Sequence, residues 1–174
     1  MSSTATATNS IAAALIAELE NEGATTRKVL ERIPPEKFDW KPHDKSMTMV
    51  RLASHVAEMH SWTVPTVTQP ELDFAKFDYK PAELKTTEDL VALFEKSYNE
   101  ALDALKGATD EIWSEPWSLK NGETTYFTMP KIAVMRSMVL NHIVHHRGQL
   151  SVYLRENDIP VPALYGPSAD EGQM

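Results

Sequence analysis

The sequence predicts an all-α protein, a four-helix bundle with a small hairpin or ordered loop between the third and fourth helices. Two observations lead to this fold class. Apolar residues recur at alternating steps of three and four along four separate segments, which is the spacing of a core-facing helical stripe. Between the last two of these segments, the Asn-Gly pair at residues 121–122 is the strongest kind of short-range signal for a hairpin.

The bulk properties are those of one globular domain, residues 1–174, with a sizeable core. The chain is 42% hydrophobic and carries a net charge of -8, without a cluster of Lys and Arg on one face. We therefore expect neither nucleic acid nor an anionic membrane as a partner, because both need a basic footprint. Since there is no cysteine, Cys-type zinc sites are excluded and any soft-metal site must be built from histidine.

The N-terminal stretch does not have the pattern of a secretory signal. Residues 1–9 are expected to form a disordered tail, and the apolar stretch Ile11–Ile16 has no basic residue before it and glutamates soon after it. No run approaches the roughly 18 apolar residues of a membrane span. The expected location is cytoplasmic, which also fits the absence of cysteine.

The first helix is predicted to follow Ser10, a good N-cap, and to run to about Ile33, where Pro34-Pro35 ends it. Its stripe is small or polar at mid-height, at Gly23 and Thr26, so we expect open space inside the bundle there. A glycine in a helix interior costs about 1 kcal/mol relative to alanine, which something should compensate.

The second helix is predicted at roughly Met47–Val67, with Ser46 as its cap and a stop or kink at Pro65. Its alternating stripe places His55 toward the interior. The connection that follows, residues 69–85, is long for a bundle. A long connection can cross the bundle and join two helices that point in the same direction.

The third helix is predicted at about Thr87–Lys106, where Gly107 marks its end. The expected hairpin then spans residues 117–126. Lys120 and Glu123 should face each other across its turn.

The fourth helix is predicted from Pro130 to about Glu156, followed by an irregular C-terminal tail, residues 159–174, on the outside of the bundle. Because His142 and His146 are four residues apart, their imidazoles should lie one above the other on the same helix face. They belong to a long stripe whose lower half is polar: Ile132, Met135, Val139, His142, His146, Gln149 and Tyr153.

Three inward histidines from two helices, His55, His142 and His146, form a candidate metal site. Three neutral imidazoles suit zinc, nickel, copper or iron, and they leave a position open for water or substrate, as catalytic sites do. The alternative for each histidine alone is a core residue that is hydrogen-bonded to a neighbour. The convergence of two helices on one interior favours the metal.

Other residues could assist such a site. Gln149 continues the stripe one step beyond His146 and could hydrogen-bond a bound water or substrate, which makes it the candidate catalytic residue. Glu58 and Asn141 could each orient an imidazole N–H, although a solvated carboxylate is an equal alternative for Glu58. His145 lies about 100° from its neighbour around the helix, so it would support the site from outside or lie at an interface.

The remaining polar residues of interest have structural roles in this interpretation. Arg147 is expected to point sideways and form a salt bridge, and Gly148 to allow a close helix crossing. His60 lies off the inward face of its helix, and His43 lies in a solvated loop.

The residues above resemble the DinB/YfiT-like superfamily of metal-binding four-helix bundles over nearly the whole chain. The most specific match is a helical histidine upstream of the string His142-x-x-x-His146-Arg147-Gly148-Gln149. Further matching stretches are Phe38-Asp39-Trp40-Lys41-Pro42, Lys45-Ser46-Met47-Thr48 and Leu52-Ala53-Ser54-His55.

The resemblance implies an up-down-down-up bundle, in agreement with the long second connection. It also implies a divalent metal, most often nickel or zinc, on His55, His142 and His146, and a homodimer. Activities known in the superfamily are thiol-dependent, namely mycothiol-dependent maleylpyruvate isomerase and bacillithiol S-transferase.

Three functions therefore remain open. The first is a metal-dependent enzyme that activates a low-molecular-weight thiol, as cosubstrate, or water against a small electrophile lying under the hairpin. Thiol transfer is the first choice within it and hydrolysis the second. The alternative is a non-catalytic metal-binding homodimer with a structural or stress-related role. The third is a protein-interaction module whose interior histidines bind nothing.

Overall fold

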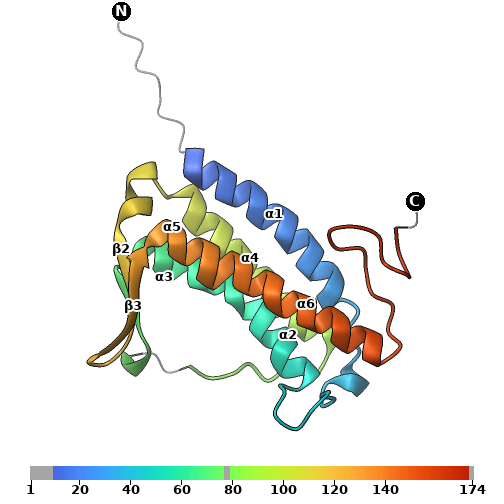
Figure 1. Cartoon of the computed structure of the whole chain (residues 1–174). Coiled ribbons are helices and arrows are strands. Elements are labelled where there is room, and N and C mark those ends of the chain that lie inside the picture. Colours follow the sequence, from blue (N-terminus) through green and yellow to red (C-terminus); the bar gives the residue numbers. More distant parts are fainter. Residues whose placement is uncertain (1–9, 77–78, 173–174) are drawn as a thin grey trace, which may run out of the picture.

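The computed structural model describes residues 10–76 and 79–172, which form a mostly helical protein with a small sheet at one end (Figure 1). The helices make four long segments, two of them interrupted: α1 (Ser10–Leu30), α2 with α3 (Met49–Glu58, Thr63–Thr68), α4 (Thr87–Lys106), and α5 with α6 (Lys131–Val134, Asn141–Glu156). The strands are β1 (Glu71–Asp73), β2 (Pro116–Asn121) and β3 (Thr124–Pro130). The prediction of an all-α chain is corrected by this sheet.

Among the described residues, no helix has both the length and the apolar character needed to cross a membrane. The expectations for residues 1–9 and for residues 173–174 lie outside the described part of the chain.

Helix α1 is capped by a residue from a distant part of the chain. The carboxylate of Asp110 accepts hydrogen bonds from the backbone N–H groups of Ser10 and Ile11, at 3.0 Å each, and so replaces the expected cap of Ser10. The helix ends at Leu30 rather than at Ile33. Its last turn tightens there, since the N–H of Ile33 donates to the carbonyl of Leu30 at 3.2 Å.

Helix α2 is capped by Thr48 and not by Ser46 as predicted. The Thr48 hydroxyl accepts from the backbone N–H of Arg51 at 3.3 Å, so the helix starts at Met49. A 3₁₀ turn, Met59–Trp62, then separates α2 from α3. The predicted kink is therefore present one turn before Pro65, where the missing N–H and the proline ring disturb regular α-helical bonding.

Polar contacts at the helix ends show that α1 and α4 are antiparallel. Thr87 at the start of α4 donates its hydroxyl hydrogen to the carbonyl of Ile33, just after α1, at 2.7 Å. At the opposite end, Asp110 follows α4 and caps the start of α1.

Helices α2 and α3 are antiparallel to α5 and α6. The hydroxyl of Tyr153, near the end of α6, donates to the carbonyl of Met47 just before α2, at 3.2 Å. The ammonium of Lys131, at the start of α5, donates to the carbonyl of Val67 in α3 at 3.1 Å.

Ion pairs between α1 and the last helical segment complete the topology. Glu18 pairs with Arg136, and Glu22 pairs with Arg147. Because the residue numbers increase in the same direction along both segments, α1 is parallel to α6. The four segments consequently run up, down, down and up (Figure 1). The connection between the second and third segments crosses the bundle, as its length predicted.

The hairpin forms with a shift of one residue from its predicted register. Asn121 pairs with Thr124, so residues 122–123 form the turn, and the glycine there has a φ of +59°. Glycine is favoured at the first central position of such a turn because it adopts positive φ without strain. Lys120 therefore does not face the glutamate of the turn, and it pairs with Glu71 of β1 at 3.4 Å.

Strand β1 was not predicted. It lies in the long second connection, where it pairs in parallel with β2, with Leu72 opposite Leu119. The sheet order is β1-β2-β3, so the crossing connection and the hairpin form a single unit at one end of the bundle.

A π-helical turn, Met135–Leu140, shifts the inward face of the last helical segment by one residue. The predicted inward residues His142 and His146 are half-buried, and Gln149 is exposed. A π turn holds more residues than an α turn, so a stripe cannot keep its phase through it. Four buried residues of α6 each lie one position further along, Ile143, Arg147, Leu150 and Leu154, whereas Tyr153 is buried where the stripe predicted it.

The open space expected at mid-height of α1 is filled by two large side chains from other helices. A Cβ atom added at Gly23 would lie 2.4 Å from Cε2 of Tyr98 in α4. The guanidinium of Arg147, only 1% exposed, donates to the backbone carbonyl of Glu22 at 3.0 Å and to the Thr26 hydroxyl at 3.1 Å. The small and polar positions of α1 therefore accommodate a ring and a buried cation.

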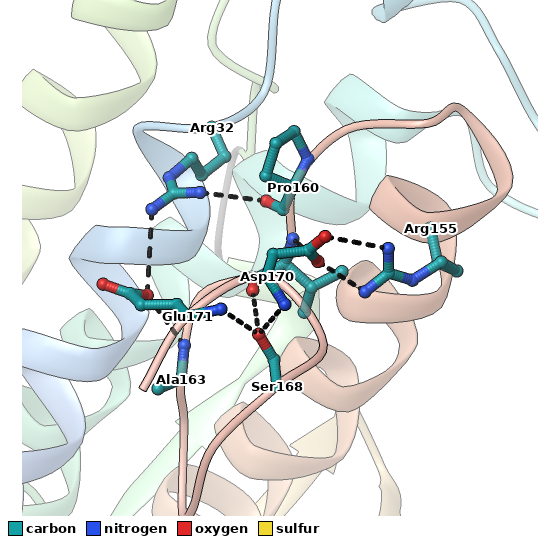
Figure 2. A network of polar contacts seen from close by, with 8 residues as sticks. Arg32, Arg155, Pro160, Ala163, Ser168, Asp170 and Glu171 are labelled. Carbon is teal, nitrogen blue, oxygen red and sulfur yellow. Dashed lines mark hydrogen bonds and ion pairs between the residues drawn. The ribbon is translucent and has the colours of Figure 1, made fainter. Parts of the chain in front are cut away.

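Residues 159–172 contain no helix or strand and are held against the ends of two helices (Figure 2). Arg155 of α6 pairs with Asp170 at 2.5 Å, and Arg32, just after α1, donates to the carbonyl of Pro160 at 3.1 Å. Arg32 also lies 3.7 Å from the carboxylate of Glu171. This network keeps the segment on the outside of the bundle.

Candidate metal centre

Helices α2 and α6 bring His55, His142 and His146 together. The ring centroid of His55 lies 5.2 Å from that of His142 and 4.9 Å from that of His146. The centroids of His142 and His146 are 4.6 Å apart. One ring nitrogen from each residue can be chosen so that all three lie within 4.8 Å of one another. The three imidazoles thus form a compact group of donors at the edge of the core.

The spacing of the two α6 histidines is close to what one ion requires. Their Nε2 atoms are 2.8 Å apart. Two imidazole nitrogens at about 2.0–2.1 Å from a tetrahedral ion are separated by about 3.3 Å. A small rotation of either ring would therefore let both nitrogens bind the same ion.

Gln149 fixes the orientation of one of these rings. Its amide oxygen lies 2.7 Å from Nδ1 of His146. Because an amide oxygen only accepts, Nδ1 carries the proton and Nε2 keeps its lone pair for a metal. Gln149 thus acts on the imidazole in this structure, whereas the sequence suggested a contact with water or substrate.

Burial keeps these histidines neutral. It lowers the pKa of His55 to about 4, and the nearby His146, His142 and Arg51 act in the same direction. Burial is also the largest cause that lowers the pKa values of His142 and His146. Near neutral pH the three rings are therefore unprotonated, which is the form that binds metals.

The π turn also contributes to the site. The imidazole of His142 hydrogen-bonds the backbone of Met138, which lies within that turn. Such turns often occur at functional sites, because they expose backbone groups that a regular helix would satisfy internally.

A cavity of about 600 Å³ begins at His55 and extends between α2, α3 and the segment around β1. Its wall is mainly apolar, with a few polar groups near His55. It is lined by Arg51, His55, Glu58, Met59, Ser61, Trp62, Pro65, Leu72, Phe74 and Tyr79. In the hairpin, under which a substrate was predicted, Trp117 is buried and its indole N–H donates to the carbonyl of Pro65 at 3.1 Å, while the ring of Tyr126 lies 6.4 Å from that of Phe74 in the cavity wall.

A model of the DinB family matches residues 1–173. The chain belongs to the DinB family.

Its relatives support the same placement. This DinB-family chain is 27% identical to the uncharacterized protein YrdA of Bacillus subtilis over 156 residues, which are 87% of the chain and 86% of YrdA. A DinB-like protein structure from Bacillus cereus superimposes with a TM-score of 0.65 at 20% identity, covering 87% of this chain and 95% of that one. The DinB-like protein YjoA of Bacillus subtilis gives 0.65 at 18% identity, covering 83% and 91%. These structural similarities show the fold.

The other residues predicted to support the candidate metal site are placed as follows. Glu58 lines the cavity, and its carboxylate accepts from the Tyr79 hydroxyl at 2.6 Å. Asn141 is exposed. His145 is also exposed, with its ring 4.8 Å from that of His146.

The two histidines that were not assigned to the site lie elsewhere. His60 is fully buried, with its ring packed edge-on against Phe94 and Tyr98 at 5.2 and 5.7 Å. His43 is exposed in a loop, where its Nδ1 accepts from the backbone N–H of Lys45 at 3.1 Å.

Two residues that line the cavity, Arg51 and Tyr79, were not predicted from the sequence. Arg51 could have been found, because it lies one turn before His55 on the same helix face. Arg147 forms its predicted salt bridge, with Glu22 at 2.5 Å, but in the core. Among the described residues, nothing lies within 4 Å of a Cβ added at Gly148, so no helix of the described chain makes the predicted close crossing there.

Proposed function

We propose that this protein is a metal-dependent enzyme that activates a low-molecular-weight thiol, or water, against a small electrophile. The observation that carries the proposal is the convergence of three imidazoles, those of His55, His142 and His146, of which His55 also lines a largely apolar cavity of about 600 Å³. Nickel or zinc is the ion that we expect there, because imidazole donors suit both.

The residues fit such an ion. Three protein ligands leave a coordination position free, which is typical of catalytic rather than structural sites. When bound, a divalent ion supplies Lewis acidity and lowers the pKa of a coordinated thiol or water toward neutrality. Gln149 keeps Nε2 of His146 directed at the site, and the apolar wall provided by residues such as Trp62 and Leu72 shields the reactants from bulk water.

Thiol transfer is the preferred reaction, because the superfamily resemblance points to thiol chemistry. In this reaction the thiol sulfur forms a bond to the electrophilic carbon and the leaving group departs with its bonding electrons. The thiol proton passes to solvent. With water in place of the thiol, the same arrangement would carry out hydrolysis.

The second candidate is a non-catalytic metal-binding homodimer. It is favoured by the outer face of α6, where Val152 is 56% exposed one turn after the uncovered Gly148. A second copy of the chain packed on this face would cover both residues. Light scattering on the native protein and on Val152→Glu measures this directly, and a dimer should become a monomer in the variant.

The metal site is tested by elemental analysis of the native protein and of the His142→Ala and His145→Ala variants after reconstitution with zinc or nickel. We expect about one equivalent in the native protein and in His145→Ala, and a loss of metal in His142→Ala. The adjacent exposed histidine is the matched control. An equal loss in both variants, or no metal in the native protein, would refute the site.

The reaction is tested with the metal-loaded protein, monochlorobimane as the electrophile, and cysteine or glutathione as the thiol. Conjugation releases chloride and is followed by fluorescence. We expect turnover that His142→Ala abolishes and His145→Ala retains. A fully loaded protein that is inactive with every common cytoplasmic thiol would leave the dimer as the better interpretation.

A further inference from the structure

We propose that the cavity beside the three histidines selects amphipathic carboxylates, with the anionic group on Arg51 and an apolar body along the aromatic wall. This inference rests on the proposed function, because it names the substrate class of the same site. It is carried by the contacts of Arg51 and by the composition of the wall.

Arg51 and His55 lie one turn apart on the same face of α2, and both line the cavity. The Nη1 atom of Arg51 is buried and, among the described residues, has no hydrogen-bond partner. A buried donor without a partner is unfavourable by about 1–3 kcal/mol, and more for a charged group. One donor of a side chain that lines the cavity therefore lacks an acceptor in the described part of the chain.

The negative charge of this cavity is already engaged elsewhere. Glu58, the only carboxylate among the described residues that line the cavity, accepts from the Tyr79 hydroxyl at 2.6 Å. Arg51 also interacts with that hydroxyl, so Tyr79 lies between the two charges. Arg51 is left without a carboxylate partner in the described part of the chain, and a ligand carboxylate would match its planar fork of donors.

The rest of the cavity selects an apolar body. Met59, Pro65 and Leu72 form its wall together with Trp62 and Phe74, whose rings meet edge-on at 6.0 Å. Its volume of about 600 Å³ lies within the ordinary range for small-molecule sites, about 300–1,000 Å³.

An aromatic side chain of the hairpin also lies next to the cavity wall. Phe74 is 39% exposed and lies 6.4 Å from the ring of Tyr126, which extends the apolar wall toward the solvent. A flat hydrocarbon group attached to the carboxylate would contact this wall while its charge reaches Arg51. The ligand class is therefore an aryl- or alkyl-carboxylate of small size.

The test uses two probes of the same shape, 3-phenylpropionate and its uncharged amide, 3-phenylpropanamide. Binding to the metal-free protein is measured by calorimetry, so that a carboxylate cannot bind through an ion. We expect 3-phenylpropionate to bind about tenfold or more tightly than the amide. In Arg51→Met this preference should disappear, whereas the Arg27→Met variant, the matched charge control at a residue of α1 that does not line the cavity, should retain it.

Two results would overturn the inference: equal affinity of the native protein for the two probes, or a preference that survives in Arg51→Met. Absence of saturable binding of 3-phenylpropionate at millimolar concentration would do the same. Circular dichroism and the metal content of Arg51→Met show whether the fold and the histidine site persist. Carboxylate preference without metal binding would refute the proposed function alone, and metal binding without carboxylate preference would refute this inference alone.

Discussion

The amide oxygen of Gln149 lies 2.7 Å from Nδ1 of His146 and thereby directs Nε2 of that ring toward His142. The contact links two exposed or half-buried residues one turn apart on α6, so it stabilises an orientation more than the fold. It is the feature of the site that most resembles the support found around metal-binding histidines.

Replacing Gln149 by Leu should lower the affinity for zinc by about 10–100-fold, because the imidazole then loses the acceptor that fixes its tautomer and direction. Competition with a fluorescent chelator measures the change. Gln149→Glu keeps an acceptor and should bind at least as well as the native protein. Asn141→Ala, an exposed change on the same helix, is the control, and an unaltered affinity in Gln149→Leu would mean that the contact is incidental.

A second prediction concerns the two glycines with opposite surroundings. Gly23→Ala should destabilise the protein by about 1–3 kcal/mol, since the new Cβ meets the ring of Tyr98, which is stacked on Phe94 and cannot easily withdraw. Gly148→Ala should stabilise it by about 0.5–1 kcal/mol, because the added methyl group meets nothing and alanine is the better helix former. Urea unfolding compares the two, and effects of the same sign would contradict the packing described for α1.

Arg147 provides a third prediction. In Arg147→Met the buried carboxylate of Glu22, 7% exposed, loses its cation, and the free energy of unfolding should fall by about 3–5 kcal/mol. The double variant Arg147→Met with Glu22→Leu should recover much of this loss, because no charge is then left unpaired. Arg155→Met, which removes an exposed ion pair with Asp170, should have a far smaller effect. A double variant no more stable than the single one would argue against the pair as the cause.

The grouping of the three histidines of the candidate metal site could be predicted from the sequence, because the position of each one depends on local geometry. His142 and His146 share a helix face through their spacing alone, and that holds whether or not the helix is regular further upstream. His55 required only the correct stripe on one other helix. Helix α4 was predicted for the same reason, since its start at Thr87 and its end at Lys106 follow from residues nearby in the sequence.

What could not be predicted depends on contacts between distant residues. The cap of α1 comes from Asp110, a hundred residues away, and β1 becomes a strand only because β2 lies beside it. The π turn moved the core face from His146 to Arg147, and no periodicity signals such a turn in advance. The cavity likewise depends on how the long connection, with Phe74, closes over α2.

The last prediction concerns pH. His60 is fully buried, and this burial lowers its pKa to about 4; the backbone of Ala57 opposes the effect and the charge of Arg147 adds to it. The unfolded chain binds the proton near the ordinary value of 6.5, so the unfolded state is favoured as the pH falls. The stabilising effect of the neutral ring is complete above 6.5 and is lost progressively as the pH approaches 4.

His60→Leu, of similar volume and unable to titrate, should remove this dependence. In metal-free protein the free energy of unfolding should fall less in the variant than in the native protein between about pH 7 and about pH 5, by about 2 kcal/mol. Urea unfolding at the two pH values provides the measurement. The exposed His145→Leu should behave as the native protein, since its ring meets solvent in both states. Parallel losses in the native protein and His60→Leu would show that His55 and the other half-buried rings, not His60, dominate the acid sensitivity.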